Sequence, residues 1–245
     1  MRWRASPEHA VTSPADTIAS LLGRTELFGT LAPDALEQIA GRCHTAQFKR
    51  GQTIYERGDA GNALHLIRSG QIRFSVVSGD GRELSVRVAK AGEIIGEIAV
   101  LDRQPRTATA VALTAVTAHS LPRAEVDRLL LQDPQFARNA IDFLCHRLRD
   151  TTDQLELIAL YPVEVRLARF LLVALKGQSS GPSGKRIPLE LGFSQGELAQ
   201  LLGASRPKVN LALGILEEAG AIGRTSDRLF CDPAVLTRIA EKTDD

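Results

Sequence analysis

The stretch from Gly92 to Ala110 combines the residue types needed to hold a sugar hydroxyl beside a phosphate. Arg106 carries a planar guanidinium that can bind a phosphate through two parallel hydrogen bonds. In the glycine-containing turn before it, the backbone N–H groups of Ile98 and Ala99 can form a concave anion-binding nest. Glu97 would repel a phosphate, but its carboxylate can accept hydrogen bonds from a ribose hydroxyl. The stretch therefore predicts a site for a sugar and a phosphate held side by side.

A second group of residues, from Phe193 to Glu217, has the spacing of a helix-turn-helix. Ser194 and Glu197 predict a capping box at the start of a first short helix, and Gly203 supplies a turn that commonly needs glycine. We expect Ser205 to cap the second helix, because serine is a preferred residue at a helix N-cap. Apolar residues at spacing i, i+3, i+4, i+7 should face the core, namely Val209, Ala212, Leu213 and Leu216.

The opposite face of this second helix carries residue types that read DNA. A recognition helix touches base edges near its N-terminus. There Arg206 could fork onto guanine, and Asn210 could pair with adenine or reach a phosphate. Lys208 and Gln195 suit phosphate contacts. The DNA-contact candidates are Gln195, Ser205, Arg206, Pro207, Lys208, Asn210 and Leu211. For this segment alone, the alternative is an ordinary helical hairpin with a solvated polar face.

The elements that must hold the sugar–phosphate stretch are short strands. From Thr45 to Leu121, short apolar runs are separated by glycines. Gln71–Val76 alternates polar and apolar residues, as a half-buried strand does. Ser78–Gly81 turns the chain into Glu83–Val88, which is a hairpin signal. The pattern predicts a small β-barrel or β-roll.

A long helix is predicted from Asp133 to Leu160. Its apolar residues recur in the a/d pattern of a two-stranded coiled coil over about three heptads. The seam positions are Ala137, Ile141, Leu144, Leu148, Thr151, Leu155 and Ile158. Such a stripe needs a partner, so we expect a homodimer; the alternative is that the stripe packs against its own domain. Pro162 ends the helix and provides a hinge, Val163–Leu175 forms another helix, and the loop Gly177–Gly184 follows.

Composition narrows the function classes. The 245 residues suffice for one or two domains, and a net charge of +1 means that a DNA-binding surface must be a local basic patch. We expect no membrane span, because no apolar run approaches roughly 18 residues, and no signal peptide, because the N-terminus is followed by no apolar stretch. Isolated cysteines indicate a reducing cytoplasm. Because the histidines are scattered and no Cys-x-x-Cys occurs, we expect no metal ion, haem or iron–sulfur cluster.

Over nearly the whole chain, the order of roll, long helix and helix-turn-helix resembles the CRP/FNR family of bacterial transcription regulators. The most specific match is Gly96-Glu97-Ile98-Ala99 followed by Pro105-Arg106-Thr107-Ala108. It resembles the phosphate-binding cassette of the cyclic-AMP receptor protein-like branch. The resemblance implies an α+β fold with a cyclic-nucleotide-binding β-roll of the double-stranded β-helix type, a dimerisation helix and a winged helix-turn-helix. The expected segments are a disordered tail (1–18), the roll domain (19–132) with short helices at its start (22–40), the dimerisation helix (133–161) and the DNA-binding domain (162–245).

The resemblance also implies roles for individual residues. Glu97 takes the ribose 2′-hydroxyl, Arg106 and Thr107 take the cyclic phosphate, and Thr151 of one subunit with Thr152 of the partner subunit reads the purine. The implied ligand-binding residues are Gly96, Glu97, Ile98, Ala99, Arg106, Thr107, Thr151 and Thr152. The alternatives are that Arg106 and Glu97 pair with each other, and that Thr151 is a solvated seam residue.

Cyclic AMP is the effector that the resemblance favours. DNA and a second copy of the chain are the implied partners, and the loop Gly177–Gly184 could contact RNA polymerase. Cyclic GMP is a rival effector, because the Thr107 hydroxyl could accept a hydrogen bond from the guanine 2-amino group. A second rival is a ligand-independent regulator with a vestigial pocket. We do not expect an enzyme acting on cyclic nucleotides, because no His/Asp cluster with ligand spacing occurs.

The recognition helix departs from the family pattern Arg-Glu-x-x-x-Arg. The same register here reads Arg206-Pro207-Lys-Val-Asn-Leu211. Proline and leucine side chains cannot form the corresponding hydrogen bonds. We therefore predict a DNA half-site that keeps the guanine read by Arg206 and otherwise differs from the family's TGTGA.

Overall fold

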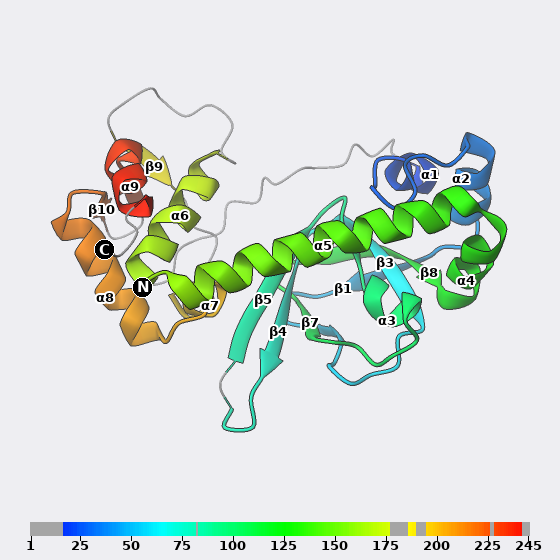
Figure 1. The fold of residues 1–245 in the computed structure, drawn as a ribbon, viewed down its shortest axis with the longest axis horizontal. Coiled ribbons are helices and arrows are strands. Elements are labelled where there is room, and N and C mark those ends of the chain that lie inside the picture. Colours follow the sequence, from blue (N-terminus) through cyan, green and yellow to red (C-terminus); the bar gives the residue numbers. More distant parts are fainter. Residues whose placement is uncertain (1–16, 82, 177–185, 190–194, 226–227, 242–245) are drawn as a thin grey trace. The chain divides into compact units, whose positions relative to one another are not determined.

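The computed structural model describes residues 17–81, 83–176, 186–189, 195–225 and 228–241 (Figure 1). They divide into an N-terminal unit that ends at Arg149 and a C-terminal unit that begins at Asp150. The division falls inside the long helix and not at its predicted ends. Most of the predicted tail, the loop 177–184 and the predicted capping residue Ser194 lie outside the described residues.

The N-terminal unit is built on two four-stranded antiparallel sheets, with strand orders β1-β8-β3-β6 and β2-β7-β4-β5. Its strands are β1 (His44–Phe48), β2 (Thr53–Tyr55), β3 (Ala63–Ser69), β4 (Gln71–Val77), β5 (Glu83–Lys90), β6 (Ile94–Ile95), β7 (Thr109–Ala112) and β8 (Val116–Pro122). Ile67 on β3 and Ile72 on β4 belong to one buried apolar cluster, so the two sheets enclose a common core. This is the predicted β-roll, and β4 and β5 run side by side as its predicted hairpin (Figure 1).

Strand register places four side chains in one row across the second sheet. Tyr55 on β2 lies opposite Ala110 on β7, Ala110 lies opposite Phe74 on β4, and Phe74 lies opposite Arg87 on β5. Directly opposed residues of antiparallel strands point to the same face. Ala110 is fully buried in the core between the sheets. The row from Tyr55 to Arg87 therefore faces the interior of the roll.

A second apolar cluster joins the helices of this unit to the roll. The helices are α1 (Ile18–Leu22), α2 (Pro33–Ala40), α3 (Glu97–Leu101), α4 (Arg123–Gln132) and the first part of α5 (Pro134–Leu160). The predicted end of the tail at residue 18 is wrong, because α1 already begins at Ile18. Thr17 caps this helix by accepting a hydrogen bond from Ser20 N at 3.2 Å, and Leu21 and Leu22 are buried.

The long helix α5 has two apolar faces. It begins after Asp133, whose Oδ1 accepts hydrogen bonds from the first turn. The face that packs into the N-terminal unit contains Phe136, Asn139, Ala140 and Phe143. Three predicted seam residues, Ile141, Leu148 and Leu155, are 58%, 68% and 65% exposed. Thr151 is also exposed, and Ala137, Leu144 and Ile158 are half-buried. For the three apolar exposed positions, the alternative that the stripe packs against its own domain is wrong.

The C-terminal unit contains the predicted helix-turn-helix and a small sheet. Its elements after α5 are α6 (Val163–Lys176), β9 (Ile187–Leu189), α7 (Gln195–Leu201), α8 (Arg206–Glu218), β10 (Ile222–Arg224), β11 (Leu229–Cys231) and α9 (Pro233–Ala240). The strands pair antiparallel in the order β10-β11-β9, which supplies the wing. Gly203, between α7 and α8, has a left-handed φ of 60°. The predicted core face of α8 is confirmed, because Val209, Ala212, Leu213 and Leu216 are buried in the core of this unit.

The prediction that Ser205 caps α8 is right about position and wrong about the side chain. Ser205 occupies the N-cap, but its hydroxyl makes no capping hydrogen bond. A capping side chain bonds the N–H of the second or third helical residue. The second residue is Pro207, which has no N–H.

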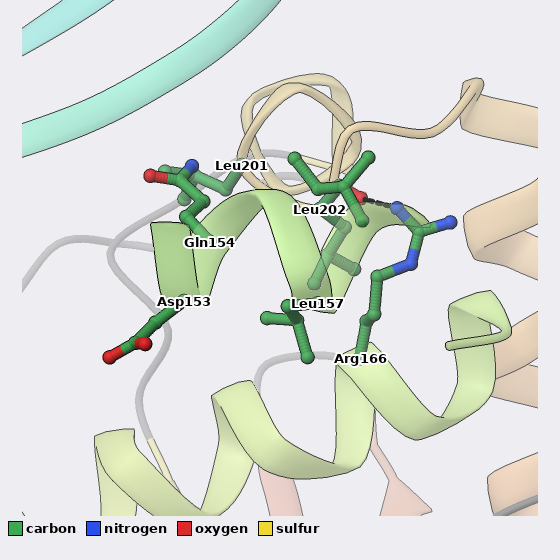
Figure 2. A pocket seen from close by; sticks show the side chains of 7 residues that line it. Asp153, Gln154, Leu157, Arg166, Leu201 and Leu202 are labelled. Atoms are coloured by element: carbon green, nitrogen blue, oxygen red, sulfur yellow. Dashed lines mark hydrogen bonds between the residues drawn. The ribbon is translucent and has the colours of Figure 1, made fainter. Parts of the chain in front are cut away.

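A cavity of about 260 Å³ lies within the C-terminal unit, between the end of α5, the start of α6 and the end of α7 (Figure 2). Its lining includes Leu157, Leu201 and Leu202, with the Arg166 guanidinium at one side. Arg166 is buried and donates a hydrogen bond from Nη1 to Leu202 O at 2.5 Å. A cation at the C-terminal end of a helix is favourable. This contact therefore fastens α6 to the helix-turn-helix.

Candidate functional site

The cassette starts with a backbone conformation that only glycine adopts easily. Gly96 follows β6 with a φ of 78° and forms the left-handed N-cap of α3. A side chain at this position would also be strained against its surroundings, because a Cβ atom would collide with Nη1 of Arg106. Gly96 thus combines a turn with the close approach of a guanidinium.

Arg106 is a buried cation held in a fixed position. Its Nη1 donates a hydrogen bond to Gly96 O at 2.7 Å, and its Nη2 donates one to Ala63 O at 2.6 Å. The guanidinium lies over the Tyr55 ring, with 4.2 Å from Cζ to the ring centroid. Among the described residues, its buried Nε has no hydrogen-bond partner. Burial lowers the pKa of this guanidinium, and nearby Tyr55 and Glu97 partly oppose that effect. An acceptor-rich anion would satisfy the remaining donor.

Glu97 is buried beside this cation but does not pair with it. Its Oε1 lies 3.7 Å from Nε of Arg147 on α5. Within the described parts of the chain, no ion pair joins Glu97 to Arg106, so the predicted alternative of a structural Arg106–Glu97 pair is wrong. Arg147 also donates a hydrogen bond to Ile94 O at 3.3 Å, which brings α5 to the strand that leads into the cassette.

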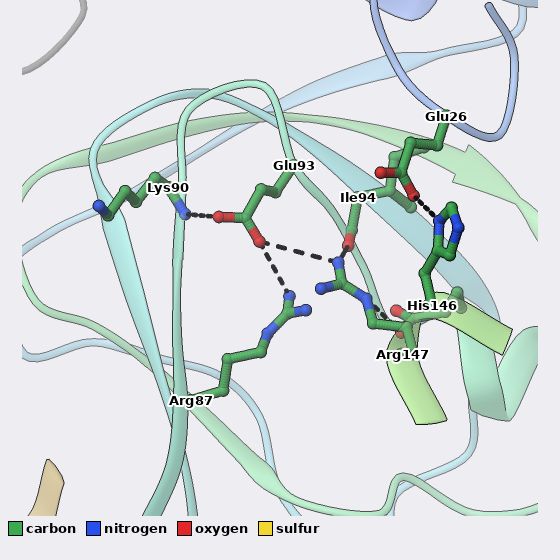
Figure 3. A network of polar contacts seen from close by, with 8 residues as sticks. Glu26, Arg87, Lys90, Glu93, Ile94, His146 and Arg147 are labelled. Carbon is green, nitrogen blue, oxygen red and sulfur yellow. Dashed lines mark hydrogen bonds and ion pairs between the residues drawn. The ribbon is translucent and has the colours of Figure 1, made fainter. Parts of the chain in front are cut away.

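A carboxylate next to the cassette joins Arg147 to a third arginine. Figure 3 shows Glu93 between the guanidinium groups of Arg87 and Arg147. The distances from Glu93 Oε2 are 3.5 Å to Arg87 Nη2 and 3.7 Å to Arg147 Nη2. Glu93 is itself held by the backbone N–H of Lys90, which donates to its Oε1 at 3.1 Å. Arg87 lies over the Phe74 ring, 5.2 Å from the centroid.

These contacts form a continuous circuit around the cassette. From the guanidinium over Tyr55 to the buried carboxylate, its members are Arg106, Tyr55, Phe74, Arg87, Glu93, Arg147 and Glu97. The Arg106–Gly96 hydrogen bond closes it. Three guanidinium groups and two carboxylates leave one positive charge, so the circuit favours an anionic ligand.

Two further rings at this site stay neutral near pH 7. His65 stacks on Tyr55 with 6.2 Å between ring centroids, and its Nδ1 lies 2.7 Å from Ser120 Oγ. Burial, with a smaller contribution from Arg106, lowers the pKa of His65 to about 4. Burial raises the pKa of the Tyr55 hydroxyl above its ordinary value. Neither ring changes the net positive charge of the circuit.

The predicted site residues fall into two groups. The structure brings together Gly96, Glu97, Ile98, Ala99 and Arg106, with the exposed Thr107 next to Arg106. Thr151 and Thr152 are exposed on the part of α5 that belongs to the C-terminal unit.

Sequence reasoning missed six side chains of this site, namely Tyr55, His65, Phe74, Arg87, Glu93 and Arg147. A signal existed for Arg147, because it lies four residues before Thr151 and helical residues at that spacing share a face. The hairpin turn at Ser78–Gly81 also gave a starting point for pairing Phe74 with Arg87. The approach of α5 to the cassette, which pairs Arg147 with Glu97, has no sequence signal of its own.

The helix-turn-helix presents its predicted DNA-contact residues outward. Gln195 is half-buried at the start of α7, and the other candidates are exposed at the start of α8: Ser205, Arg206, Pro207, Lys208, Asn210 and Leu211. The far end of α8 is fixed to the wing, because Arg224 on β10 donates two hydrogen bonds to the Glu217 carboxylate. Those hydrogen bonds lower the pKa of Glu217.

The described residues contain no group of three His, Cys, Asp or Glu side chains placed to hold a metal ion. Among them, no helix combines the length and apolar character required to cross a membrane.

Comparison with known proteins gives consistent matches for both units. A family model described as a cyclic nucleotide-binding domain matches residues 45–133, and one described as a Crp-like helix-turn-helix domain matches residues 165–239. The chain is 30% identical over 202 residues to a CRP-like cAMP-activated global transcriptional regulator of Mycobacterium tuberculosis, covering 82% of this chain and 90% of that one. It is 31% identical over 196 residues to the cyclic AMP receptor protein of Thermus thermophilus, covering 80% and 87%. The solved structure of FixK2 from Bradyrhizobium japonicum shares the fold, with a TM-score of 0.69 at 19% identity over 82% of this chain and 98% of that one.

Proposed function

Because this chain belongs to the CRP/FNR family of cyclic-nucleotide-binding transcription regulators, we propose that a cyclic nucleotide bound at its cassette controls its binding to DNA. The fold and the relatives are those of regulators and not of enzymes. The observation that carries the proposal is Arg106, a buried guanidinium braced by two carbonyl groups, with an unsatisfied Nε, beside the carboxylate of Glu97.

Each part of the nucleotide has a matching group in this proposal. The cyclic phosphate binds Arg106, the Thr107 hydroxyl and the backbone N–H groups of Ile98 and Ala99. Glu97 accepts a hydrogen bond from the ribose 2′-hydroxyl, and Nε of Arg147 lies 3.7 Å from its Oε1 on the other side. The purine reaches Thr151 of one subunit and Thr152 of the partner subunit.

Cyclic AMP is the proposed effector. The printed names of the Mycobacterium tuberculosis and Thermus thermophilus relatives refer to cyclic AMP, which supports adenine as the base. Cyclic GMP is a second candidate, favoured by one observation: the Arg87 guanidinium belongs to the same circuit of contacts. In this proposal Glu97 and Arg106 bind only sugar and phosphate, so the choice of base depends on other residues, Thr107 among them.

The DNA-bound form proposed here is a homodimer. The exposed stripe of α5 at Ile141 and Leu155 supports a coiled coil with a second copy. Nucleotide binding favours one arrangement about the Pro162 hinge, in which the two recognition helices fit successive major grooves about 34 Å apart. Arg206 reads a guanine, and Lys208 and Gln195 contact phosphates.

A paired substitution tests the assigned phosphate site. Arg106→Ala removes the buried guanidinium, whereas Arg103→Ala removes a guanidinium from an exposed side chain of the same loop that pairs with Asp127. Fluorescence anisotropy with DNA selected from a random library should show a cyclic-AMP response for the wild type and Arg103→Ala, and none for Arg106→Ala. Arg106→Lys, which keeps the charge without the fork, should respond weakly. An unchanged response in folded Arg106→Ala would refute the assignment.

A further inference from the structure

Arg87 is placed in the nucleotide site by strand register. It lies directly opposite Phe74 across the β4–β5 ladder, and its guanidinium rests 5.2 Å from the centre of that ring. The row that it ends, through Phe74 and Ala110 to Tyr55, faces the roll interior, and Tyr55 in turn lies under Arg106. Arg87 and the phosphate-binding arginine therefore stand at opposite ends of one row of side chains.

The other contacts of Arg87 lead to the ribose carboxylate. Its Nη2 lies 3.5 Å from Glu93 Oε2, and Glu93 lies 3.7 Å from Arg147, which contacts Glu97. Two guanidinium groups thus lie around one carboxylate, and burial with the neighbouring Arg147 lowers the pKa of Arg87. The Arg87–Glu93 distance is that of an ion pair and exceeds a normal hydrogen bond. The N–H donors of the Arg87 guanidinium can thus bind a ligand that carries hydrogen-bond acceptors.

The position of the base follows from the covalent order of a nucleotide, and this step rests on the proposed function. The ribose joins the phosphate to the base. With the phosphate at Arg106 and the ribose at Glu97, the base must extend past Glu97. The side chains that continue the circuit from Glu97 in that direction are Arg147, Glu93 and Arg87.

We infer that Arg87 is the specificity-determining residue of this pocket and that it strengthens the binding of cyclic GMP relative to cyclic AMP. Guanine presents two adjacent acceptors, O6 and N7, which match the two donors of a guanidinium fork. Adenine presents N7 beside an amino group, and that donor cannot pair with a guanidinium. A bidentate arginine–guanine contact corresponds to a preference of about tenfold to a hundredfold.

The test is calorimetric titration of the full chain with three cyclic nucleotides. Cyclic AMP and cyclic GMP differ at the edge that Arg87 would read. Cyclic inosine monophosphate keeps O6 and N7 of guanine but lacks the 2-amino group, so it separates reading by Arg87 from reading by the Thr107 hydroxyl. The variants are Arg87→Gln, which removes the fork and the charge, and Arg87→Lys, which keeps the charge but replaces the planar fork by one ammonium. Arg73→Gln is the matched control, because Arg73 is the next residue to Phe74 on β4 and points to the opposite face, where it pairs with Glu83 at 3.1 Å.

Arg87→Gln should weaken the binding of cyclic GMP and cyclic inosine monophosphate about tenfold to a hundredfold more than that of cyclic AMP, because loss of the charge affects all three nucleotides and loss of the fork only the first two. Arg87→Lys, whose ammonium can still donate to O6 or N7, should lose less than Arg87→Gln, and Arg73→Gln should keep the wild-type ratios. Equal weakening of all three nucleotides by Arg87→Gln would overturn the inference and leave the proposed function intact, as would a loss confined to cyclic GMP. A wild-type protein that binds none of the three would overturn the proposed function and the inference together.

Discussion

At the scale of single residues, the site depends on the contact between one glycine and one buried arginine. Gly96 provides a left-handed turn, and the carbonyl of that turn accepts a hydrogen bond from Arg106 at 2.7 Å. The guanidinium is therefore positioned before a ligand arrives, which reduces the entropic cost of binding.

Substitution of Gly96 should abolish ligand binding, because the new side chain would collide with Arg106 in addition to straining the backbone. In Gly96→Ala, the new Cβ would displace the Arg106 guanidinium, so nucleotide binding should be lost. Gly92→Ala is the control, because Gly92 has a similar φ of 89° but nothing within 4 Å of a Cβ. Both should lose about 1 to 3 kcal/mol of unfolding free energy from the strained backbone. Calorimetry should find wild-type nucleotide affinity in Gly92→Ala; equal affinities in the two variants would contradict the role given to Gly96.

His65 makes the stability of the roll depend on pH. Its pKa is about 4 in the folded protein against an ordinary 6.5, so the unfolded chain binds more protons between these values. The contribution of His65 to the unfolding free energy is therefore greatest above pH 6.5 and should fall by roughly 3 kcal/mol as the pH drops to 4. The unfolding free energy, measured by urea denaturation across this range, should depend less steeply on pH in His65→Gln than in the wild type. A slope identical to that of the wild type would exclude His65 as its source.

At the scale of elements, α5 serves two surfaces at once. One face packs Phe136 and Phe143 into the N-terminal unit, and another leaves Ile141 and Leu155 exposed. Apolar residues this exposed on a helix of 27 residues are typical of an association surface.

A charge in that stripe should prevent dimerisation. Leu155→Asp would place a carboxylate from each copy at the same seam, and burying an unpaired charge is costly. Leu131→Asp is the control, because Leu131 is 87% exposed on α4, outside the stripe. Sedimentation equilibrium should find a dimer for the wild type and Leu131→Asp and a monomer for Leu155→Asp. A dimer in all three would place the interface elsewhere.

The recognition helix should read a half-site of its own. Arg206 is exposed at the first position of α8, and Pro207 and Leu211 stand where the family pattern has hydrogen-bonding residues. Selection from random DNA should return a half-site that keeps one guanine, and Arg206→Ala should cost about 1 to 3 kcal/mol and relax specificity at that position. Lys208→Ala should weaken binding to all sequences alike. Recovery of an unchanged TGTGA half-site would contradict this assignment.

The elements were largely predictable from sequence because their signals are local. The heptad stripe predicted α5 to within one residue at its start, and the spacing of Val209 and Leu216 predicted the buried face of α8. Ser205 occupies the predicted N-cap but makes no capping hydrogen bond, and the proline two residues later removes one of the two N–H groups that could have donated it.

At the scale of the whole molecule, the order of roll, helix and helix-turn-helix was readable, whereas the circuit around the cassette was not. Arg147 meets Glu97 only after α5 packs against the roll, and Arg87 meets Phe74 only in one strand register. Both contacts join segments that are distant in sequence, and their partners are chosen by packing. The cassette itself was found because its residues are close in sequence and their chemistry is unusual together.

The two units must act as one if a nucleotide controls DNA binding. A ligand shifts an equilibrium only through its different affinities for the two states. If the nucleotide tightens DNA binding, DNA must tighten nucleotide binding by the same factor. This reciprocity is a property of the whole chain, and neither unit alone can show it.

Calorimetric titration of cyclic AMP into the full-length protein, without and with its selected DNA, tests the central claim most directly. We predict saturable binding that DNA strengthens by the factor with which cyclic AMP strengthens DNA binding, and that Arg106→Ala abolishes in both conditions. Cyclic GMP titrated in the same way should show the same coupling if it is the stronger ligand. Absence of binding by both nucleotides, or binding that DNA does not change, would contradict control of DNA binding through the cassette.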